Sequence, residues 1–252
     1  MTVESVQLDV SVDGIATLTL NRPEKHNALN AEMIAALNAM LDRLAVDQNV
    51  RVLVLTGRGK SFCAGGDLKW FRELVTENRA GRIARSKVIS DLVRKLHVFP
   101  KPVIGRINGN AFGAGTGLLA ACDIAIATVN ARFSIGETRM GLVPGTVAPF
   151  VIERIGPAKA RTIMLSGAPF DAKQAEKIGL LDQVASSDAE MDELVDRITR
   201  DHLAAAPTAI SRTKQMIRQI AELPLDEACT EASEAIADGW ESGEAEARLK
   251  TL

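Results

Sequence analysis

Apolar and polar residues alternate near the start of the chain, which is the pattern of half-buried strands. Apolar residues occupy every second position in residues 6–12 and again in residues 16–20. Asp13 and Gly14 separate the two runs, and an Asp-Gly pair favours the tight turns that join antiparallel strands. We therefore predict a β-hairpin at this end of the chain.

The pattern then changes to helical spacing and back to a strand. Apolar residues recur at helical spacing over residues 33–44, and Asn30 before them is a common helix N-cap residue. Residues 51–56 (RVLVLT) are largely apolar, as in a strand that is buried on both faces. A Gly-rich loop follows over residues 57–66, and Asp67 after it is placed to cap another helix.

The same order of elements recurs further along the chain. The segments are a helix at 82–96, a strand at 102–107, a Gly-rich loop at 108–117, a short helix at 118–121 and a strand at 122–128. A repeated order of strand, loop and helix predicts an α/β core with right-handed crossovers.

From residue 152 onward the pattern is almost entirely helical. We expect one core over residues 1–200 and a helical C-terminal region over residues 201–252. Ile210 and Ile217 share one face of a helix in that region. This apolar face predicts packing against a neighbouring copy of the chain.

Length and charge limit the possible functions. The chain has 252 residues, of which 46% are hydrophobic and 25% charged, as expected for one large globular domain. Its formal net charge is −2, and no segment is densely basic. Broad electrostatic binding to nucleic acid or to an acidic membrane is therefore not expected.

Cysteine spacing and the N-terminal residues indicate the compartment. Cys63, Cys122 and Cys229 have no Cys-x-x-Cys spacing, so we expect neither a disulfide framework nor a zinc site. The first residues lack the basic and apolar pattern of a signal peptide, and no apolar run is long enough to span a bilayer. We expect a cytoplasmic protein.

Two Gly-rich loops, at 60–68 and 108–117, each follow a strand and precede a helix. The first backbone N–H groups of a helix have no helical partner, so two such loops could direct two donors at one oxygen atom. That is the geometry of an oxyanion hole. The glycines could also simply permit close packing. A dinucleotide-binding fingerprint does not fit the second loop, because its third glycine would fall at Leu118.

Four motifs occur in the order found in the crotonase (enoyl-CoA hydratase/isomerase) superfamily, and the chain resembles that family. The motifs are Asn21-Arg22-Pro23 with Asn27-Ala28-Leu29; Phe62-Cys63-Ala64-Gly65-Gly66-Asp67-Leu68; Asn108-Gly109 through Asp123; and Phe133 through Glu137 to Gly145. The resemblance implies a crotonase-type spiral core of repeated ββα units with a helical C-terminal oligomerisation region. It also implies a homotrimer or a dimer of trimers.

By this resemblance, the backbone N–H groups of Gly66 and Ala114 hold the thioester oxygen of an acyl-CoA. Ala64 would hold the adenine through its backbone, and Lys60 and Lys69 match positions that in some members approach the CoA phosphates. Coenzyme A would be part of the substrate, and we expect no tightly bound cofactor and no metal.

The resemblance also identifies Glu137 as the acid-base residue. Family hydratases usually carry a second glutamate, but Gly117 occupies its position here. We expect Gly117 to leave a roomier and less negatively charged pocket that favours a branched or carboxylated acyl group. Residues expected in the pocket wall are Trp70, Leu74, Leu142 and Val147.

Three functions remain open. The run over residues 117–127 is closest in pattern to bacterial members resembling methylglutaconyl-CoA hydratase, so we favour hydration or dehydration of an enoyl-CoA. An enoyl-CoA isomerase with a single glutamate is the alternative. A non-catalytic acyl-CoA-binding homologue is the alternative of another class. The chain has no tyrosine, which excludes family variants that depend on one.

Overall fold

Two β-sheets form the frame of the molecule, in a computed structural model that describes residues 4–250. The larger sheet has the order β1-β2-β3-β5-β7-β10, and its strands are Val6–Val10, Ile15–Leu20, Val52–Gly57, Val103–Ile107, Ile124–Thr128 and Gln183–Ala185. The smaller sheet has the order β4-β6-β8-β9, and its strands are Ser61–Cys63, Asn110–Phe112, Arg132–Ser134 and Phe170–Asp171.

The chain passes from the larger sheet to the smaller sheet and then into helix, three times in succession. Strands β3 and β4 lead to helices α2 and α3, strands β5 and β6 to α4, and strands β7 and β8 to α5. These helices are Leu68–Thr76, Arg79–His97, Ala114–Ala120 and Ala148–Met164. The predicted spiral of ββα units is confirmed.

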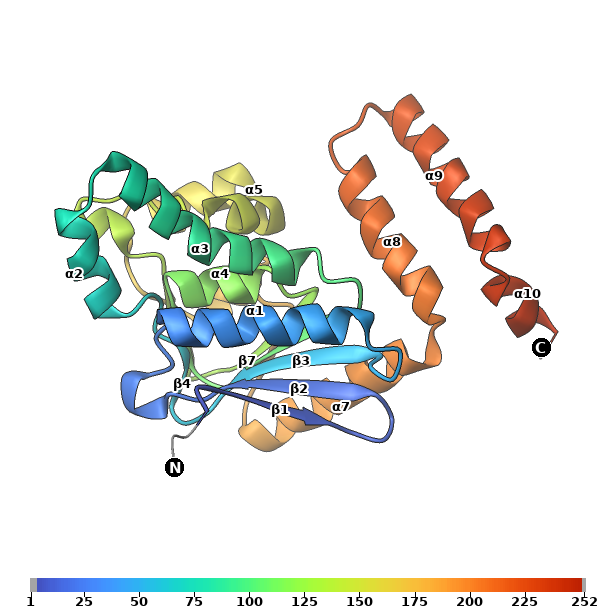
Figure 1. The fold of residues 1–252 in the computed structure, drawn as a ribbon, viewed down its shortest axis with the longest axis horizontal. Coiled ribbons are helices and arrows are strands. Elements are labelled where there is room, and N and C mark those ends of the chain that lie inside the picture. Colours follow the sequence, from blue (N-terminus) through green and yellow to red (C-terminus); the bar gives the residue numbers. More distant parts are fainter. Residues whose placement is uncertain (1–3, 251–252) are drawn as a thin grey trace.

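Helices cover both faces of the larger sheet, as the fully buried strand β3 requires (Figure 1). Leu53 and Leu55 belong to the main core, to which helix α1 (Ala31–Val46) contributes. Val52 and Val54 face the other way and pack with helix α7 (Asp188–Ala204). Apolar residues at successive positions of β3 therefore serve two cores.

The hairpin and the first helix are confirmed. Strands β1 and β2 pair antiparallel, with Val6 opposite Leu20, although β1 ends before the exposed Val12. Asn30 caps α1 by accepting a hydrogen bond from the Met33 N–H at 2.9 Å.

Helix α4 begins earlier than predicted, at Ala114 instead of residue 118. A Cβ atom on Gly115 would lie 2.2 Å from the Cys63 carbonyl oxygen, which places α4 directly against strand β4. Glycine in this segment therefore permits contact between a helix and a strand. Tertiary packing overrides the low helix propensity of glycine, which is why the composition alone predicted a loop.

The remaining helices are α6 (Ala172–Lys177), α8 (Pro207–Ile220), α9 (Leu225–Glu241) and α10 (Glu244–Leu249). Helices α8, α9 and α10 extend away from the sheets as an arm, and they contain no buried residue (Figure 1). No helix within residues 4–250 is both long and apolar enough to cross a membrane.

Candidate active site

Three chain segments meet at one edge of the smaller sheet. Strands β4, β6 and β8 are parallel neighbours, so their carboxyl ends lie at the same edge. The residues that follow them are 64–66, 113–114 and 135–137. Gly66, Ala114 and Glu137 are thereby brought to one place, although they are far apart in the sequence.

The first two segments touch each other. A Cβ atom on Gly65 would lie 2.9 Å from the Phe112 carbonyl oxygen and 3.6 Å from the Ala114 nitrogen. Ala114 is the first residue of α4, where a backbone N–H has no helical acceptor. Within residues 4–250, no hydrogen bond uses the N–H of Gly66 or of Ala114. Both donors are therefore available to a ligand.

The loop of Gly66 is held from both sides. The Leu29 N–H donates to the Gly65 carbonyl at 2.8 Å, and the Asp67 N–H donates to the Leu29 carbonyl at 2.9 Å. The Arg22 guanidinium donates to the Ala28 carbonyl at 2.6 Å and forms an ion pair with Asp67 at 3.2 Å. This explains why residues 21–29 belong to the motif set. Sequence reasoning did not assign them this positioning role.

Glu137 is the only carboxylate residue among the buried polar residues of the described chain, and the residue is 8% exposed. A Cβ atom on Gly113 would lie 3.2 Å from Glu137 Oε1, so the carboxylate is next to the start of α4. Its Oε2 atom has no hydrogen-bond partner among the described residues. Burial raises the pKa of Glu137, and a hydrogen bond from its own backbone N–H opposes this more weakly.

Short contacts fix the turn that carries Glu137. It is the first residue of the 3₁₀ helix Glu137–Met140, and its carbonyl accepts a hydrogen bond from the Leu142 N–H at 3.0 Å. The Thr138 hydroxyl donates to the Met164 carbonyl at 3.1 Å, at the end of α5. Two amide donors and one buried carboxylate could together polarise a carbonyl group and move a proton beside it.

The expectation of a roomier pocket at Gly117 is wrong. A Cβ atom on Gly117 would lie 2.4 Å from Val147 Cγ1 and 3.6 Å from Val93 Cγ2. Val147 is fully buried and fills the space that a side chain at 117 would enter. The sequence could not show this contact, because it joins residues from separate elements.

The other expected residues lie in different positions. Ala64 is half-buried at the same edge as Gly66, and its N–H donates to the His26 carbonyl at 2.9 Å. Lys69 is exposed on the first turn of α2. Lys60 precedes β4, so its backbone lies at the opposite end of that strand, about 13 Å from Ala64.

The residues that we expected in the wall of the acyl pocket also lie in different positions. Phe71 was not among them, yet a Cβ atom on Gly66 would lie 2.9 Å from Phe71 Cε2. Trp70 instead lies under the Arg85 guanidinium, 5.8 Å from ring centroid to cation. Leu142 is half exposed, and Leu74 is partly buried on α2.

Two of the three cysteines, Cys63 and Cys122, are buried. Burial raises the pKa of Cys63 and of Cys122 to about 12, so neither thiol ionises near neutral pH. Within residues 4–250, no group of three or more potential His, Cys, Asp or Glu ligands could hold a metal ion.

Comparison with known proteins gives a consistent result. The family model for enoyl-CoA hydratase/isomerase matches residues 11–242. The chain is 37% identical to the 1,2-epoxyphenylacetyl-CoA isomerase of Escherichia coli, covering 84% of this chain and 82% of the relative. It is 34% identical to the 2,3-dehydroadipyl-CoA hydratase of the same organism, covering 84% and 81%. The crystal structure of an enoyl-CoA hydratase from Shewanella pealeana superimposes with a TM-score of 0.93 at 28% identity, covering 99% of this chain and 93% of that one.

Proposed function

The chain belongs to the enoyl-CoA hydratase/isomerase family, and on that premise we propose that it hydrates an enoyl-CoA with Glu137 as its single acid-base residue. Hydration or isomerisation of acyl-CoA thioesters is the activity of the family relatives. The observation that carries the proposal is the meeting of two unused N–H donors and one buried carboxylate at the edge of the smaller sheet.

The two donors would stabilise negative charge on the thioester oxygen. Gly66 and Ala114 each have a free backbone N–H at the site, and Ala114 keeps a negative φ as a helical residue. Losing one such donor typically raises a barrier by about 2.7–4 kcal/mol. Proline at position 66 removes the N–H group. We expect a folded Gly66→Pro variant to lose turnover far more than CoA-ester affinity.

Glu137 would transfer the proton. Its carboxylate takes a proton from water while the water oxygen bonds to C3 and the electron pair of the double bond moves toward the thioester oxygen. The protonated Glu137 then returns that proton to C2, so no other proton donor is required. The raised pKa of Glu137 supports this cycle, because a carboxylate with a raised pKa accepts a proton more readily than an exposed glutamate does.

Double-bond isomerisation is the second candidate, and one observation favours it. Val147 occupies the space beside Gly117, so the site offers one carboxylate, which suffices to carry a proton between C4 and C2. Absorbance of the conjugated thioester distinguishes the two reactions. Hydration of a 2-enoyl-CoA removes this absorbance, whereas isomerisation of a 3-enoyl-CoA creates it. Chromatography then identifies the product as hydrated or unhydrated.

A non-catalytic acyl-CoA-binding role is the third alternative. The buried Oε2 atom of Glu137 argues against it, because an unpartnered buried carboxylate is costly to keep without a function. Binding of acyl-CoA without turnover of either 2-enoyl or 3-enoyl substrates would establish that alternative and refute the enzymatic proposal.

Coenzyme A would enter as part of the substrate. We propose that the backbone of Ala64, half-buried at the site edge, contacts the adenine, and that Lys69, exposed on the first turn of α2, approaches a phosphate. The backbone of Lys60 lies further from the site edge than that of Ala64, so Lys60 would need its full side-chain length to reach a phosphate. We expect no tightly bound cofactor, and we expect the protein in the cytoplasm.

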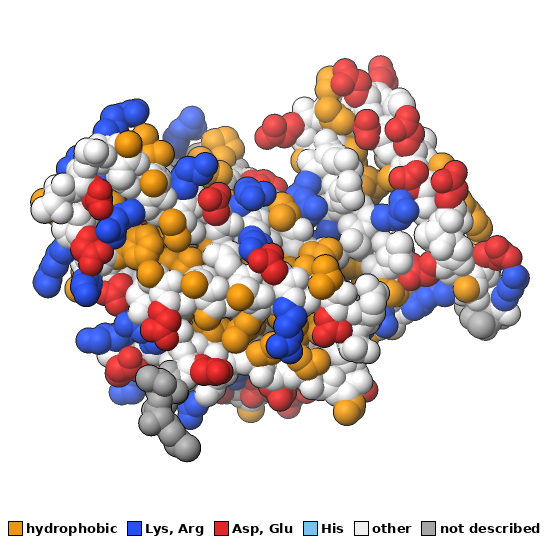
Figure 2. All heavy atoms as spheres, viewed as in Figure 1, with side chains coloured by type: hydrophobic (Ala, Val, Ile, Leu, Met, Phe, Trp, Pro, Cys, Tyr) orange, Lys and Arg blue, Asp and Glu red, His pale blue; other side chains and the backbone are white. Residues whose placement is uncertain are grey.

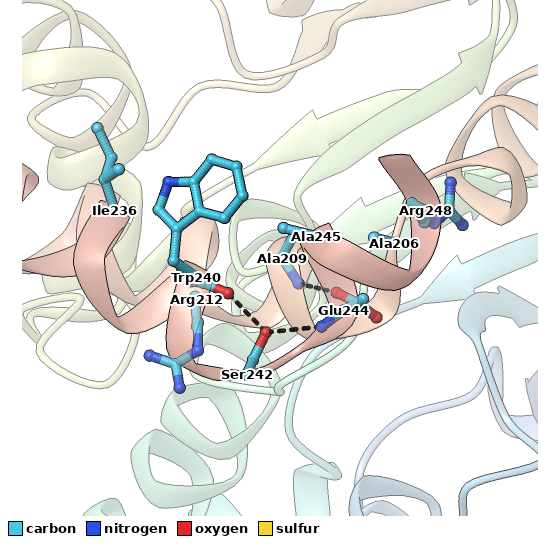
Figure 3. Close-up of a pocket in the computed structure, with 10 residues that line it drawn as sticks. Ala206, Ala209, Arg212, Ile236, Trp240, Ser242, Glu244, Ala245 and Arg248 are labelled. Carbon is cyan, nitrogen blue, oxygen red and sulfur yellow. Dashed lines mark hydrogen bonds between the residues drawn. The ribbon is translucent and has the colours of Figure 1, made fainter. Parts of the chain in front are cut away.

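We also propose that the C-terminal region beyond residue 200 joins copies of the chain into a trimer or a dimer of trimers. Ile236 and Trp240 on α9 line a cavity of about 180 Å³ that α8 and α10 complete (Figure 3). Ile236 and Trp240 are 64% and 58% exposed, so this cavity presents two large apolar residues to solvent. Light scattering should report three or six copies, and Trp240→Glu should lower that number. A monomeric wild type at micromolar concentration would refute this assembly.

A further inference from the structure

Arg22 lies at the start of a chain of hydrogen bonds that ends at the Gly66 N–H group. Its guanidinium donates to the Ala28 carbonyl at 2.6 Å. The N–H group of the next residue, Leu29, donates to the Gly65 carbonyl at 2.8 Å. The N–H group that follows this carbonyl is that of Gly66, which has no acceptor within residues 4–250. Two peptide units therefore lie between the cation and the candidate oxyanion donor.

The planar peptide unit transmits direction along this chain. In a trans peptide unit the C=O and N–H bonds point to opposite sides, so a hydrogen bond on one side fixes the direction of the group on the other. Both units, 28–29 and 65–66, are trans. The bond from Arg22 to Ala28 thus directs the Leu29 N–H, and the bond from Leu29 directs the Gly66 N–H to the side away from Leu29.

The positive charge of Arg22 also strengthens each donor along the chain. Hydrogen-bonded groups polarise one another, and the effect is larger where water is excluded. The Arg22 side chain is 17% exposed, and Leu29 and Gly65 are buried. The guanidinium draws electron density from the first peptide unit, which makes the Leu29 N–H a stronger donor. By the same effect in the second unit, the Gly66 N–H stabilises negative charge more strongly.

Polar contacts hold Arg22 at the head of the chain. Both terminal nitrogens of its guanidinium lie 3.2 Å from Asp67 Oδ2. The Arg22 backbone N–H donates to the side chain of Asn27 at 2.8 Å, and the fully buried Asn27 donates to the Ser61 carbonyl at 2.8 Å. Asp67 balances part of the charge, but the shortest of these guanidinium contacts is the one with Ala28.

The second donor is supported differently. The peptide unit that ends at the Ala114 N–H begins with the Gly113 carbonyl, which accepts a hydrogen bond from the Gly117 N–H at 3.1 Å. This bond comes from a neutral amide, whereas the chain that ends at Gly66 begins with a cation. The two donors are therefore not equivalent, and we expect Gly66 to be the stronger one.

Charge elsewhere on the surface does not replace this local contact. Figure 2 shows Lys and Arg side chains intermixed with Asp and Glu side chains on the visible face, and the formal net charge is −2. A broad positive field at the site is therefore not expected. Arg22 acts on the Gly66 donor through its hydrogen bonds.

We propose that Arg22 is a positioning residue for the reaction, one that orients and polarises the Gly66 N–H through the peptide units 28–29 and 65–66. The inference rests on the proposed function and adds to it a charged residue that does not touch the substrate. Loss of Arg22 should lower turnover and change CoA-ester affinity little, because the strengthened donor acts on charge that develops in the transition state.

Bound 4-dimethylaminocinnamoyl-CoA tests this inference without any turnover. The absorbance of this conjugated thioester moves to longer wavelength as its carbonyl is polarised. We expect a red shift on binding to the wild type and a smaller one in Arg22→Met, with the dissociation constant changed by less than about threefold. Arg22→Lys keeps a cationic donor and should restore most of the shift. With crotonyl-CoA as substrate, kcat should fall roughly tenfold in Arg22→Met while KM changes little.

Arg154 on α5 is a matched control with the same kinds of contact. Its guanidinium donates to the Leu180 carbonyl at 2.8 Å and the Cys122 carbonyl at 2.6 Å, and it pairs with Asp182 at 2.5 Å. These bonds join α5 to the segments before β7 and β10. Arg154→Met should lower the free energy of unfolding, as Arg22→Met does, and leave the red shift unchanged. Urea unfolding compares the two variants.

A second variant keeps the test decisive if Arg22→Met does not fold. Arg22→Gln retains a neutral donor for the Ala28 carbonyl and removes the charge. Its red shift should be smaller than that of Arg22→Lys, because the direction of the peptide unit is kept while its polarisation is lost.

Four results would overturn the inference. A wild type without a red shift would show that the two donors do not hold the thioester oxygen. A full red shift in Arg22→Met would show that the guanidinium does not act on the donor. An equal loss of the shift in Arg154→Met would assign the effect to stability alone. A shift in Arg22→Lys no larger than that in the uncharged variants would exclude transmission of charge.

Failure of the proposed function gives a different result. A protein without enoyl-CoA turnover could still show a red shift that depends on Arg22, because binding of the conjugated thioester requires no reaction.

Discussion

The site edge and the C-terminal arm are built in opposite ways. Around Glu137 the chain buries its own apolar residues, and short backbone contacts hold each loop. Helices α8 to α10 bury no residue completely, and polar contacts join their start to the core. Lys214 on α8 pairs with Asp123 at 2.6 Å and donates to the Lys101 carbonyl at 3.0 Å. The three candidate site residues come together within one chain, whereas the arm buries little of its apolar surface against that chain.

The largest expected effect is on turnover, and it concerns the site alone. Glu137→Gln keeps the side-chain shape and removes the ionisable group. We expect the turnover number to fall by at least about 100-fold, with unchanged acyl-CoA affinity and an unchanged number of copies. Steady-state kinetics, calorimetry and light scattering measure the three quantities. Turnover close to that of the wild type would show that another residue transfers the proton.

Replacement of glycine by alanine should change the stability of the protein in opposite directions at the site edge and in the C-terminal arm. Gly117→Ala places a Cβ atom against Val147 and should lower the free energy of unfolding by roughly 1–3 kcal/mol. Gly239 lies within α9, and a Cβ atom there would meet nothing within 4 Å. Gly239→Ala should therefore stabilise the protein by roughly 0.5–1 kcal/mol. Urea unfolding measures both, and equal effects would contradict the difference in packing.

Removal of the polar contact should loosen the arm from the core. The Lys214 side chain is 10% exposed, and Lys214→Met leaves the Asp123 carboxylate without its cation. We expect the free energy of unfolding to fall by about 1–2 kcal/mol. The effect stays moderate because water still reaches Asp123 in part. The control is Lys250→Met, which breaks an exposed pair with Glu246 at the end of the arm and should change stability little. Faster hydrogen exchange should be confined to α8 to α10 in the Lys214 variant.

The smallest expected effect is a pH dependence of the folding stability that Glu137 causes. Burial raises the pKa of Glu137 above its unfolded value, so its contribution favours the folded state at low pH. That contribution is lost as the pH rises through the raised pKa. Between the two pKa values, the wild type should lose stability relative to Glu137→Gln as the pH increases. Parallel stability curves for the two proteins would refute the raised pKa.

Much of the fold and part of the site follow from sequence patterns. Local rules predicted the hairpin, the Asn30 cap and the buried strand β3, because spacing and capping act over a few residues. Motif order predicted that Gly66, Ala114 and Glu137 meet, since parallel strands end at one edge. The roles of these three residues stay predictions.

The remaining features depend on contacts between distant segments. The early start of α4 results from its packing on β4, and the filled space at Gly117 results from Val147. The ion pair between Arg22 and Asp67 likewise needs two distant segments to approach each other. Neither residue spacing nor composition predicts contacts between distant segments, because nothing within one segment identifies its partner in the other.

The contact between Gly117 and Val147 has an evolutionary consequence. A glutamate introduced at 117 alone would collide with the valine, and removal of the valine side chain alone would leave a void in the core. Each first step is therefore harmful, although the two together could be tolerated. Such sign epistasis makes the two positions dependent on each other, and directed evolution toward an acid at position 117 should start from a library that varies both codons at once.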